Sequence, residues 1–190
     1  MLKLIPKWYI RYKFFNSLFL GLSVGVIFTI YAPLDPSIYS IGGILLAIGM
    51  LGVARLYYKI LNIEWFFRIS LLVEIVLLLA VGYFLIFPYT YMTAMLVYLG
   101  YQLTFVFGSY LLRAETLIVE TSDMLTTLDT AKQLGYLIGM GVSYLFYKLL
   151  EYYAISDNQD KIYNLHYILI AVEITIIALI LKSFISEKSL

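Results

Sequence analysis

The chain has 190 residues, of which 63% are hydrophobic and 13% are charged, and its net charge is +1. Soluble domains are about 45 to 50% apolar and about 25% charged, so lipid is the expected surrounding of this chain. The small net charge and the lack of a basic stripe exclude nucleic-acid binding. Cysteine is absent and His166 is the one histidine. Disulfides and thiol chemistry are therefore excluded, and neither a metal site nor a cofactor is expected.

Six apolar stretches predict six transmembrane helices, because a helix needs about 20 mostly apolar residues to cross a bilayer. They lie at residues 14–32, 38–58, 66–87, 91–112, 131–150 and 163–184. Pro33 and Pro36 interrupt the chain after the first stretch, Pro88 interrupts it after the third, and the polar residues 156–160 separate the last two. The sequence therefore predicts an all-α, polytopic membrane protein in which residues 1–190 form a single transmembrane domain.

The distribution of Lys and Arg predicts the orientation. Only Lys148 and Lys161 lie on one side of the predicted spans, so eleven of the 13 basic residues lie on the other. Basic segments next to membrane spans stay in the cytoplasm. Both termini are therefore predicted to be cytoplasmic, in a multi-pass protein of the inner (plasma) membrane.

Residues 113–130 predict an amphipathic connector on the cytoplasmic side. Leu117, Ile118, Leu125 and Leu128 are spaced for one helical face, and acidic residues occupy the rest of the surface. One interpretation is a gating helix that lies on the membrane surface. The alternative is a solvated connector without a functional role.

The two halves of the chain resemble one another. Residues 52–61 and 141–150 read GVARLYYKIL and GVSYLFYKLL, with six of ten positions identical, and the third and sixth spans carry Val-Glu-Ile at Glu74 and Glu173. The predicted repeats are residues 14–87 and 91–184. Each has three spans, so the second enters the membrane from the opposite side. Such a 3+3 inverted repeat is typical of secondary transporters; chance matching between apolar sequences is the alternative.

Six spans, an inverted repeat and a basic loop after the second span resemble one six-helix half of a major facilitator superfamily (MFS) transporter. That family carries a Gly-x-Leu-Ala-Asp-Arg-x-Gly-Arg-type signature in this loop. Here Gly52, Ala54, Arg55 and Lys59 stand in its place, without the Asp or the second Gly. The resemblance implies movement of a small solute or ion by alternating access. Because a facilitator has two halves, it also implies a parallel homodimer or a second membrane subunit.

Glu74 and Glu173 are the candidates for proton coupling. Ionisable side chains deep in a membrane are costly and usually functional, and burial disfavours the charged form of a carboxyl. The alternative is that each carboxyl only ties neighbouring helices together. The resemblance favours that alternative, since the third and sixth helices of a facilitator half do not line its cavity.

Other polar residues are candidates for a solute path or a gate. The path candidates lie in the first and fourth spans, which the resemblance places beside the cavity: Asn16, Thr93, Tyr98, Tyr101 and Gln102. An interhelical hydrogen bond is the alternative role for Gln102. The candidates for a cytoplasmic gate are Arg55, Arg113 and Glu115. Gly21, Gly25, Gly135 and Gly139 are small enough to let helices approach, and we expect them to pack mainly within one protomer.

No common enzyme motif occurs in the sequence, so catalytic activity is not expected. We expect a transporter of a small solute or ion, with proton coupling and as a homodimer. Two alternatives stay open. The chain is either a non-transporting membrane scaffold or assembly subunit, or one half of a split transporter whose other half is a different protein.

Overall fold

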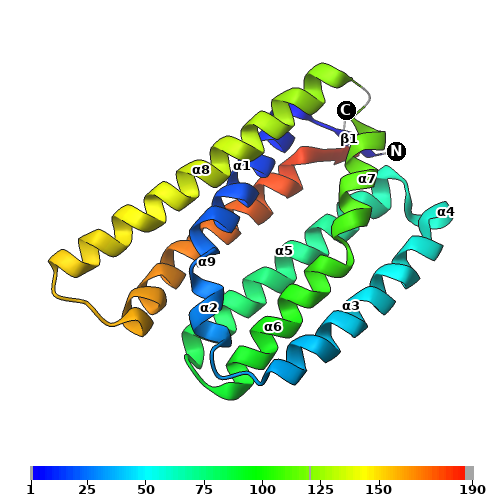
Figure 1. The fold of residues 1–190 in the computed structure, drawn as a ribbon. Coiled ribbons are helices and arrows are strands. Elements are labelled where there is room, and N and C mark those ends of the chain that lie inside the picture. Colours follow the sequence, from blue (N-terminus) through cyan, green and yellow to red (C-terminus); the bar gives the residue numbers. More distant parts are fainter. Residues whose placement is uncertain (1, 120, 187–190) are drawn as a thin grey trace.

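The computed structural model describes residues 2–119 and 121–186, which fold almost entirely into helices (Figure 1). The helices are α1 (Pro6–Ser23), α2 (Val26–Tyr31), α3 (Pro36–Arg55), α4 (Tyr57–Ile60), α5 (Ile63–Ile86), α6 (Tyr91–Val106), α7 (Gly108–Ile118), α8 (Ser122–Tyr152) and α9 (Asn158–Ser183). Two short strands, β1 (Leu2–Leu4) and β2 (Phe184–Ser186), lie at the ends of the described chain. The predicted all-helical class is confirmed.

Four helical segments of the described residues are long and apolar enough to cross a membrane. They are Pro36–Arg55, Ile63–Ile86, Tyr91–Ile118 and Asn158–Ser183. These segments contain most of the predicted spans 38–58, 66–87, 91–112 and 163–184, and they indicate a membrane protein. The predicted spans 14–32 and 131–150 are also helical but do not meet the same description. The span 14–32 is divided between α1, which ends at Ser23 and has basic residues in its first half, and α2. Helix α8 is longer than the span 131–150 and has charged residues near both ends.

Polar residues determine where the helices begin. Asp35, Asn62, Thr90 and Asp157 each precede a helix, and each accepts a hydrogen bond from a backbone N–H in its first turn, at 2.8, 3.1, 3.0 and 2.8 Å respectively. Such caps satisfy N–H groups that have no partner within the helix. The turns predicted from proline and from residues 156–160 are confirmed, although Asn158 already belongs to α9.

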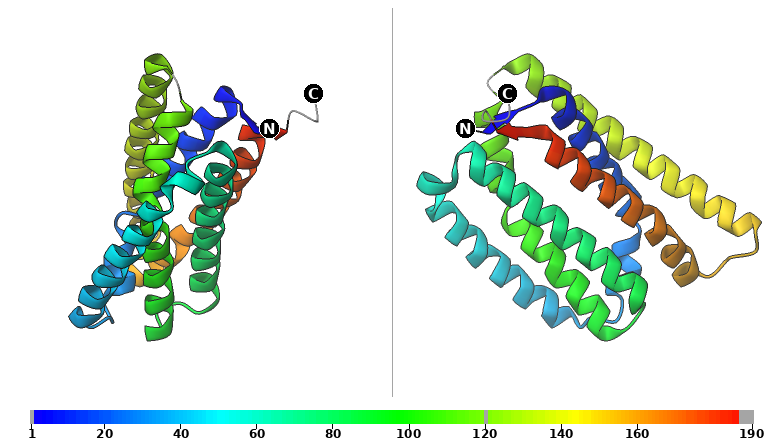
Figure 2. Two further views of the ribbon diagram at one scale, coloured as in Figure 1. Left: turned by 90° about the vertical axis from the view of Figure 1, so that its right-hand side faces the viewer. Right: turned by 180° about the vertical axis from the view of Figure 1, so that it is seen from behind.

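The long helices pack side by side in the order α8, α1, α9, α5, α6, α3 (Figure 1). Helix α8 forms one edge of this row and packs mainly against α1, while α3 forms the other edge and packs mainly against α6. The view from behind shows the same order reversed (Figure 2). At one end of the bundle α2 contacts α6 and α9, and at the other end α7 contacts α5 and α3. Helices α5 and α9 therefore meet in the middle of the molecule.

Glycines bring the backbones of α1 and α8 into contact. A Cβ atom added to Gly139 would meet the Leu18 carbonyl oxygen and would lie 3.0 Å from the Leu22 nitrogen and 3.1 Å from the Gly21 Cα. Gly135 lies equally close to backbone atoms of α1. The prediction that these glycines pack within one protomer is confirmed for Gly21, Gly135 and Gly139.

The two ends of the chain are tied together at one end of the bundle. Strands β1 and β2 pair antiparallel, with Lys3 opposite Ile185. The Trp8 ring lies 4.8 Å from the Arg11 guanidinium carbon and 5.2 Å from the Lys182 Nζ. Cations over an aromatic face are attracted to it. Both described termini therefore lie on the same side of the helix row (Figure 1).

The predicted connector at residues 113–130 does not form a helix of its own. Its first part belongs to α7 and its last part to the first turns of α8, while Glu120 lies outside the described residues. Leu128 is completely buried, whereas Leu117 is 61% exposed. The apolar residues that suggested a common face thus belong to two different helices.

Candidate functional site

Two buried glutamates meet at the contact between α5 and α9. Glu74 on α5 is 1% exposed and Glu173 on α9 is 0% exposed. Their carboxyl groups lie within hydrogen-bonding range of each other. We call Glu74 and Glu173 the carboxyl pair. The structure thus brings together the two residues that the sequence singled out for proton coupling.

Helix α1 supplies the polar contacts of Glu74. The Tyr12 hydroxyl donates to Glu74 Oε1 at 2.6 Å, and the Asn16 Nδ2 donates to the same oxygen at 3.0 Å. Tyr12 and Asn16 lie one helical turn apart and so share a face of α1. Asn16, a predicted path residue, therefore belongs to the surroundings of the carboxyl pair.

Three oxygens of the carboxyl pair have no donor among the described residues: Glu74 Oε2, Glu173 Oε1 and Glu173 Oε2. An ionised carboxyl only accepts hydrogen bonds, whereas a protonated one also donates. One proton placed between the two groups would supply the donor that both lack. This arrangement is suited to holding and releasing a single proton.

Tyr101 extends this polar region beyond the carboxyl pair. Its hydroxyl lies beside Ser23 on α1 and within electrostatic reach of Glu173. Next to Tyr101 is a cavity of about 10 Å³ that is also lined by His166, roughly the size that holds one water molecule. His166 stacks on Phe84 with 3.9 Å between ring centroids and contacts the Ile162 carbonyl through Nδ1 at 2.8 Å. Tyr101 is the second predicted path residue near the carboxyl pair.

The other predicted path residues lie elsewhere. Thr93 is completely buried, and its hydroxyl bonds to the Phe87 carbonyl at the turn before α6. Tyr98 packs its ring against Tyr31 and Tyr39, each at 5.4 Å between centroids. Gln102 has a buried side-chain oxygen without a partner in the described part of the chain. Thr93 and Tyr98 therefore lie in packed surroundings. The interhelical hydrogen bond given as the alternative role of Gln102 is not formed among the described residues.

Glu115 joins three helices at the end of the bundle where the termini lie. It is 3% exposed and forms ion pairs with Lys13 of α1 at 2.6 Å and with Lys132 of α8 at 2.8 Å. Lys132 also contacts Asp129 at 3.0 Å. We call Lys13, Glu115 and Lys132 the Glu115 cluster. It ties α7 to α1 and α8.

The two arginines predicted for a gate take no part in the Glu115 cluster. Arg113 lies over the Tyr57 ring, with 5.7 Å from its guanidinium carbon to the ring centroid. Arg55 is exposed at the end of α3 and has no ion pair within residues 2–119 and 121–186. Of the three predicted gate residues, Glu115 alone forms ion pairs with other helices among the described residues.

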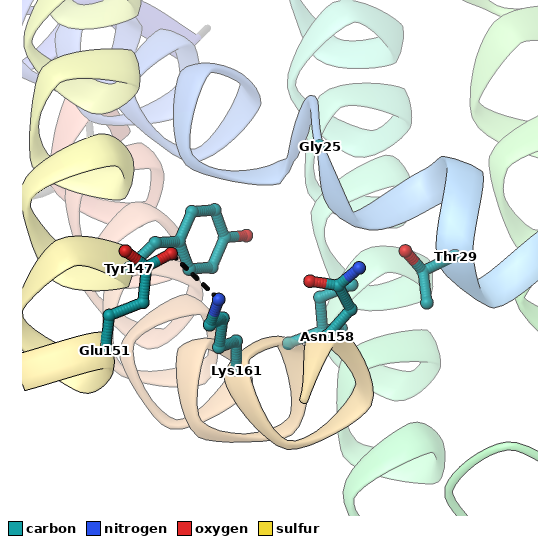
Figure 3. A pocket seen from close by; sticks show the side chains of 7 residues that line it. Gly25, Thr29, Tyr147, Glu151, Asn158 and Lys161 are labelled. Carbon is teal, nitrogen blue, oxygen red and sulfur yellow. Dashed lines mark hydrogen bonds and ion pairs between the residues drawn. The ribbon is translucent and has the colours of Figure 1, made fainter. Parts of the chain in front are cut away.

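A pocket of about 290 Å³ opens at the opposite end, where α1 stops, α8 ends and α9 begins (Figure 3). We call it the distal pocket. Its lining residues are Gly25, Thr29, Tyr147, Glu151, Asn158, Lys161 and Ile162. Glu151 bonds to Lys148 at 2.8 Å and to Lys161 at 2.9 Å. The hydrogen bonds that Lys148 and Lys161 donate lower the pKa of Glu151 to about 2, and the bond from Lys148 has the larger effect.

No protein-family model matches the chain, and no curated protein or solved structure matches it either. Its function has to be inferred from its own residues.

Tyr12, Lys13 and Lys132 are site residues that the sequence predictions did not include. A signal was present for Tyr12 but not for Lys13, because Tyr9, Tyr12 and Asn16 recur at the spacing of one helical face. That face begins before residue 14, in the basic segment that precedes the first predicted span, so it lay outside the stretch in which site residues were sought. Lys132 carried no signal, since its partner on α7 depends on how the helices pack.

Proposed function

We propose that this chain is a proton-coupled secondary transporter that crosses the inner membrane six times, with both termini in the cytoplasm. The observation that carries the proposal is the carboxyl pair, buried where two helices meet at the middle of the row. Carboxyls at such positions in membrane proteins commonly relay protons. The transported species is a small solute or ion.

The α1–α2 segment and α8, which would bring the four spans to six, have uncharged central segments. Residues 14–32 of the α1–α2 segment and residues 133–147 of α8 contain no charged side chain. Helix α8 has 31 residues, which corresponds to about 46 Å at about 1.5 Å per residue. That length exceeds the hydrocarbon thickness of about 30 Å, so the charged ends of α8 can extend beyond the bilayer. Both helices also run alongside the four apolar ones (Figure 1).

The packing of the helices supports an inverted repeat of the kind found in one MFS half. In such a repeat α1, α3 and α5 are equivalent to α6, α8 and α9, in that order. The α1–α8 contact is then equivalent to the α6–α3 contact, and the α1–α9 contact is equivalent to the α6–α5 contact. The α5–α9 contact is equivalent to itself, because exchanging the repeats exchanges these two helices. The first helix of each repeat is interrupted, after Ser23 in one and at Phe107 in the other. The carboxyl pair would then lie on the pseudo-two-fold axis.

The geometry suggests how a proton would move the two repeats. Two carboxylates side by side repel one another, whereas a carboxylic acid beside a carboxylate forms a hydrogen bond. Gain or loss of one proton would therefore change the attraction between α5 and α9. Tyr12 and Asn16 would transmit this change to α1, because both bond to Glu74. With the Glu115 cluster closed and the distal pocket open, this conformation faces the side opposite the termini.

Replacing Glu74 or Glu173 by glutamine tests proton coupling. Proteoliposomes containing the pH dye pyranine would be challenged with a panel of small organic acids, amines and polyols under an imposed pH gradient. We expect at least one solute to drive proton movement in the unchanged protein, and E74Q and E173Q to reduce it to the level of empty liposomes. Glutamine has the same shape but cannot release a proton at neutral pH.

Glu64→Gln is the matched control, because Glu64 is exposed in the first turn of the same helix as Glu74. It should leave proton movement unchanged. Folding of E74Q and E173Q should also be preserved, since the new amide donates a hydrogen bond to the remaining carboxyl. Proton movement that persists in both variants, or that no solute elicits, would refute the proposal and favour a scaffold role.

The proposal includes a parallel homodimer, which would supply the second half of a facilitator. Helix α3 has little contact with the rest of the protein, and its residues Ile41, Ile44, Leu45, Ile48 and Leu51 are all more than half exposed. We expect a mass corresponding to two chains in a mild detergent, measured by light scattering. A monomer that still transports would exclude the dimer, and co-purification of a different six-span protein would indicate a split transporter.

A further inference from the structure

The distal pocket contains hydrogen-bonding groups that the protein itself leaves unused. The Tyr147 hydroxyl is buried and has no partner among the described residues. The Thr29 hydroxyl and the Asn158 amide likewise have none within residues 2–119 and 121–186. In Figure 3 these three groups point toward the space beneath Gly25. Unused polar groups that converge on a pocket are typical of a binding site for a polar solute.

The charges around the distal pocket favour an anion. Both oxygens of Glu151 are occupied, Oε1 by Lys161 and Oε2 by Lys148. The ammonium group of Lys161 has three N–H donors and uses one of them on Glu151, so two remain. Lys161 is also only 12% exposed, which limits how well water solvates it. The site therefore has unused cationic donors, whereas each oxygen of its one lining carboxylate already faces an ammonium group.

Among the described residues, no other acidic residue lines the distal pocket. Asp157 precedes α9 and accepts hydrogen bonds from the backbone N–H groups of Gln159 and Asp160 at 2.8 and 3.2 Å. Asp160 is exposed and lies outside the lining. Lys148 lies outside the lining but already pairs with Glu151, so the positive charge of Lys161 is not balanced by a second carboxylate of the lining. A single negative charge on the solute would balance it.

We propose that the distal pocket binds a small monocarboxylate. Lys161 would hold the carboxylate, while Tyr147, Thr29 and Asn158 would bond to the rest of the molecule. At about 290 Å³ the pocket has the volume of the smallest common ligand sites, of roughly 300 Å³. A dicarboxylate would bring a second charge with no second unused cation to meet it.

The single charge of a monocarboxylate also matches the single proton of the carboxyl pair. This step rests on the proposed function. One anion in the distal pocket and one proton on Glu74 or Glu173 sum to zero charge. Their movement together is electroneutral, so a membrane potential does no work on it. Transport should then respond to a pH gradient and be indifferent to a potassium diffusion potential set with valinomycin.

Isothermal titration calorimetry of the purified full-length protein tests the site directly. The probes are acetate and lactate, with glycerol and choline as a neutral and a cationic solute of similar size. We expect saturable binding of at least one acid and none of glycerol or choline. Lys161→Gln should weaken binding about tenfold or more, because charge-assisted hydrogen bonds are the strong ones.

Lys148→Gln is the matched control, since Lys148 holds the same glutamate but does not line the distal pocket. It should weaken binding less than K161Q does, because it removes a charge that offsets Glu151 but no donor to the solute. A second variant, Gly25→Leu, fills the pocket without altering its charge. Gly25 has an ordinary helical φ of −76°, and a Cβ there would meet no atom closer than the Tyr147 hydroxyl at 4.0 Å. G25L should fold normally and lose binding.

The outcomes separate this inference from the proposed function. Binding of an acid that depends on Lys161, without any proton movement in proteoliposomes, supports the site and refutes transport. Proton movement driven by another class of solute, with no acid bound, supports transport and overturns the site. Binding of choline or glycerol in preference to the acids, or equal binding of an acid by K161Q, also overturns it.

Discussion

Alanine at Gly139 is expected to destabilise the protein, whereas alanine at Gly141 is expected to stabilise it. In a helix, Gly→Ala normally adds about 0.5 to 1 kcal/mol of stability, because the glycine backbone loses more freedom on folding. Gly141 should follow this rule, since nothing lies within 4 Å of a Cβ placed there. At Gly139 the new Cβ meets the backbone of Leu18, Gly21 and Leu22.

Backbone atoms cannot rotate away as a side chain does, so G139A must push α1 and α8 apart. Overpacking of this kind costs about 1 to 3 kcal/mol, which outweighs the stability that replacing a helical glycine normally adds. Unfolding in sodium dodecyl sulfate, followed by far-ultraviolet circular dichroism, measures both free energies in the same micelles. If G139A matched or exceeded G141A in stability, the close approach of the two helices would be disproved.

The helical segments were predictable because their physical causes are local. Long apolar stretches require helices in lipid, and the caps at Asp35 and Asp157 lie where proline and polar residues end those stretches. Breaks inside a helix were not predictable. The interruption after Ser23 falls among apolar residues, where neither proline nor a charge marks it.

The carboxyl pair was predictable as two separate residues, since an acidic side chain inside an apolar stretch is conspicuous. That Glu74 and Glu173 face one another depends on α5 packing against α9, and the Val-Glu-Ile match was the one hint of it in the sequence. Their donors from α1 depend on the same packing. Partners within one helix can be read from spacing, but partners on different helices cannot.

The residues predicted for a gate illustrate this difference. Arg55 and Arg113 lie in neighbouring predicted loops and so appeared available to Glu115. The structure instead brings Glu115 on α7 within reach of Lys13 on α1 and Lys132 on α8, and it pairs with both. Helix order, which no local pattern encodes, decides which cation an acidic residue meets.

Glu115→Gln is expected to cost about 3 to 5 kcal/mol, because removing one member of a buried ion pair leaves the other charge uncompensated. Here Lys13 would lose its partner and Lys132 would keep only Asp129, and the two lysine side chains are only 14% and 22% exposed. The two ammonium groups would then repel each other at short range with little solvent to screen them. Helices α1, α7 and α8 would lose their common attachment.

Glu151 provides a matched control, because it also lies between two lysines but is 40% exposed instead of 3%. Exposed ion pairs contribute little to stability and are screened by salt. Glu151→Gln should therefore change the free energy of unfolding only slightly at neutral pH. What Glu151 does contribute is present above the ordinary pKa of a glutamate, about 4.3, and disappears as the pH falls toward its own pKa of about 2.

Unfolding of E115Q and E151Q in sodium dodecyl sulfate, at low and at high salt, separates the two cases. We expect a large loss for E115Q that salt reduces only in part, and a small loss for E151Q that salt removes. Adding Lys13→Met to E115Q should recover part of the stability, because it removes one of the two opposed charges. Equal losses in E115Q and E151Q would mean that water reaches Glu115 as freely as Glu151, and the cluster would then be too weak to hold that end of the bundle closed.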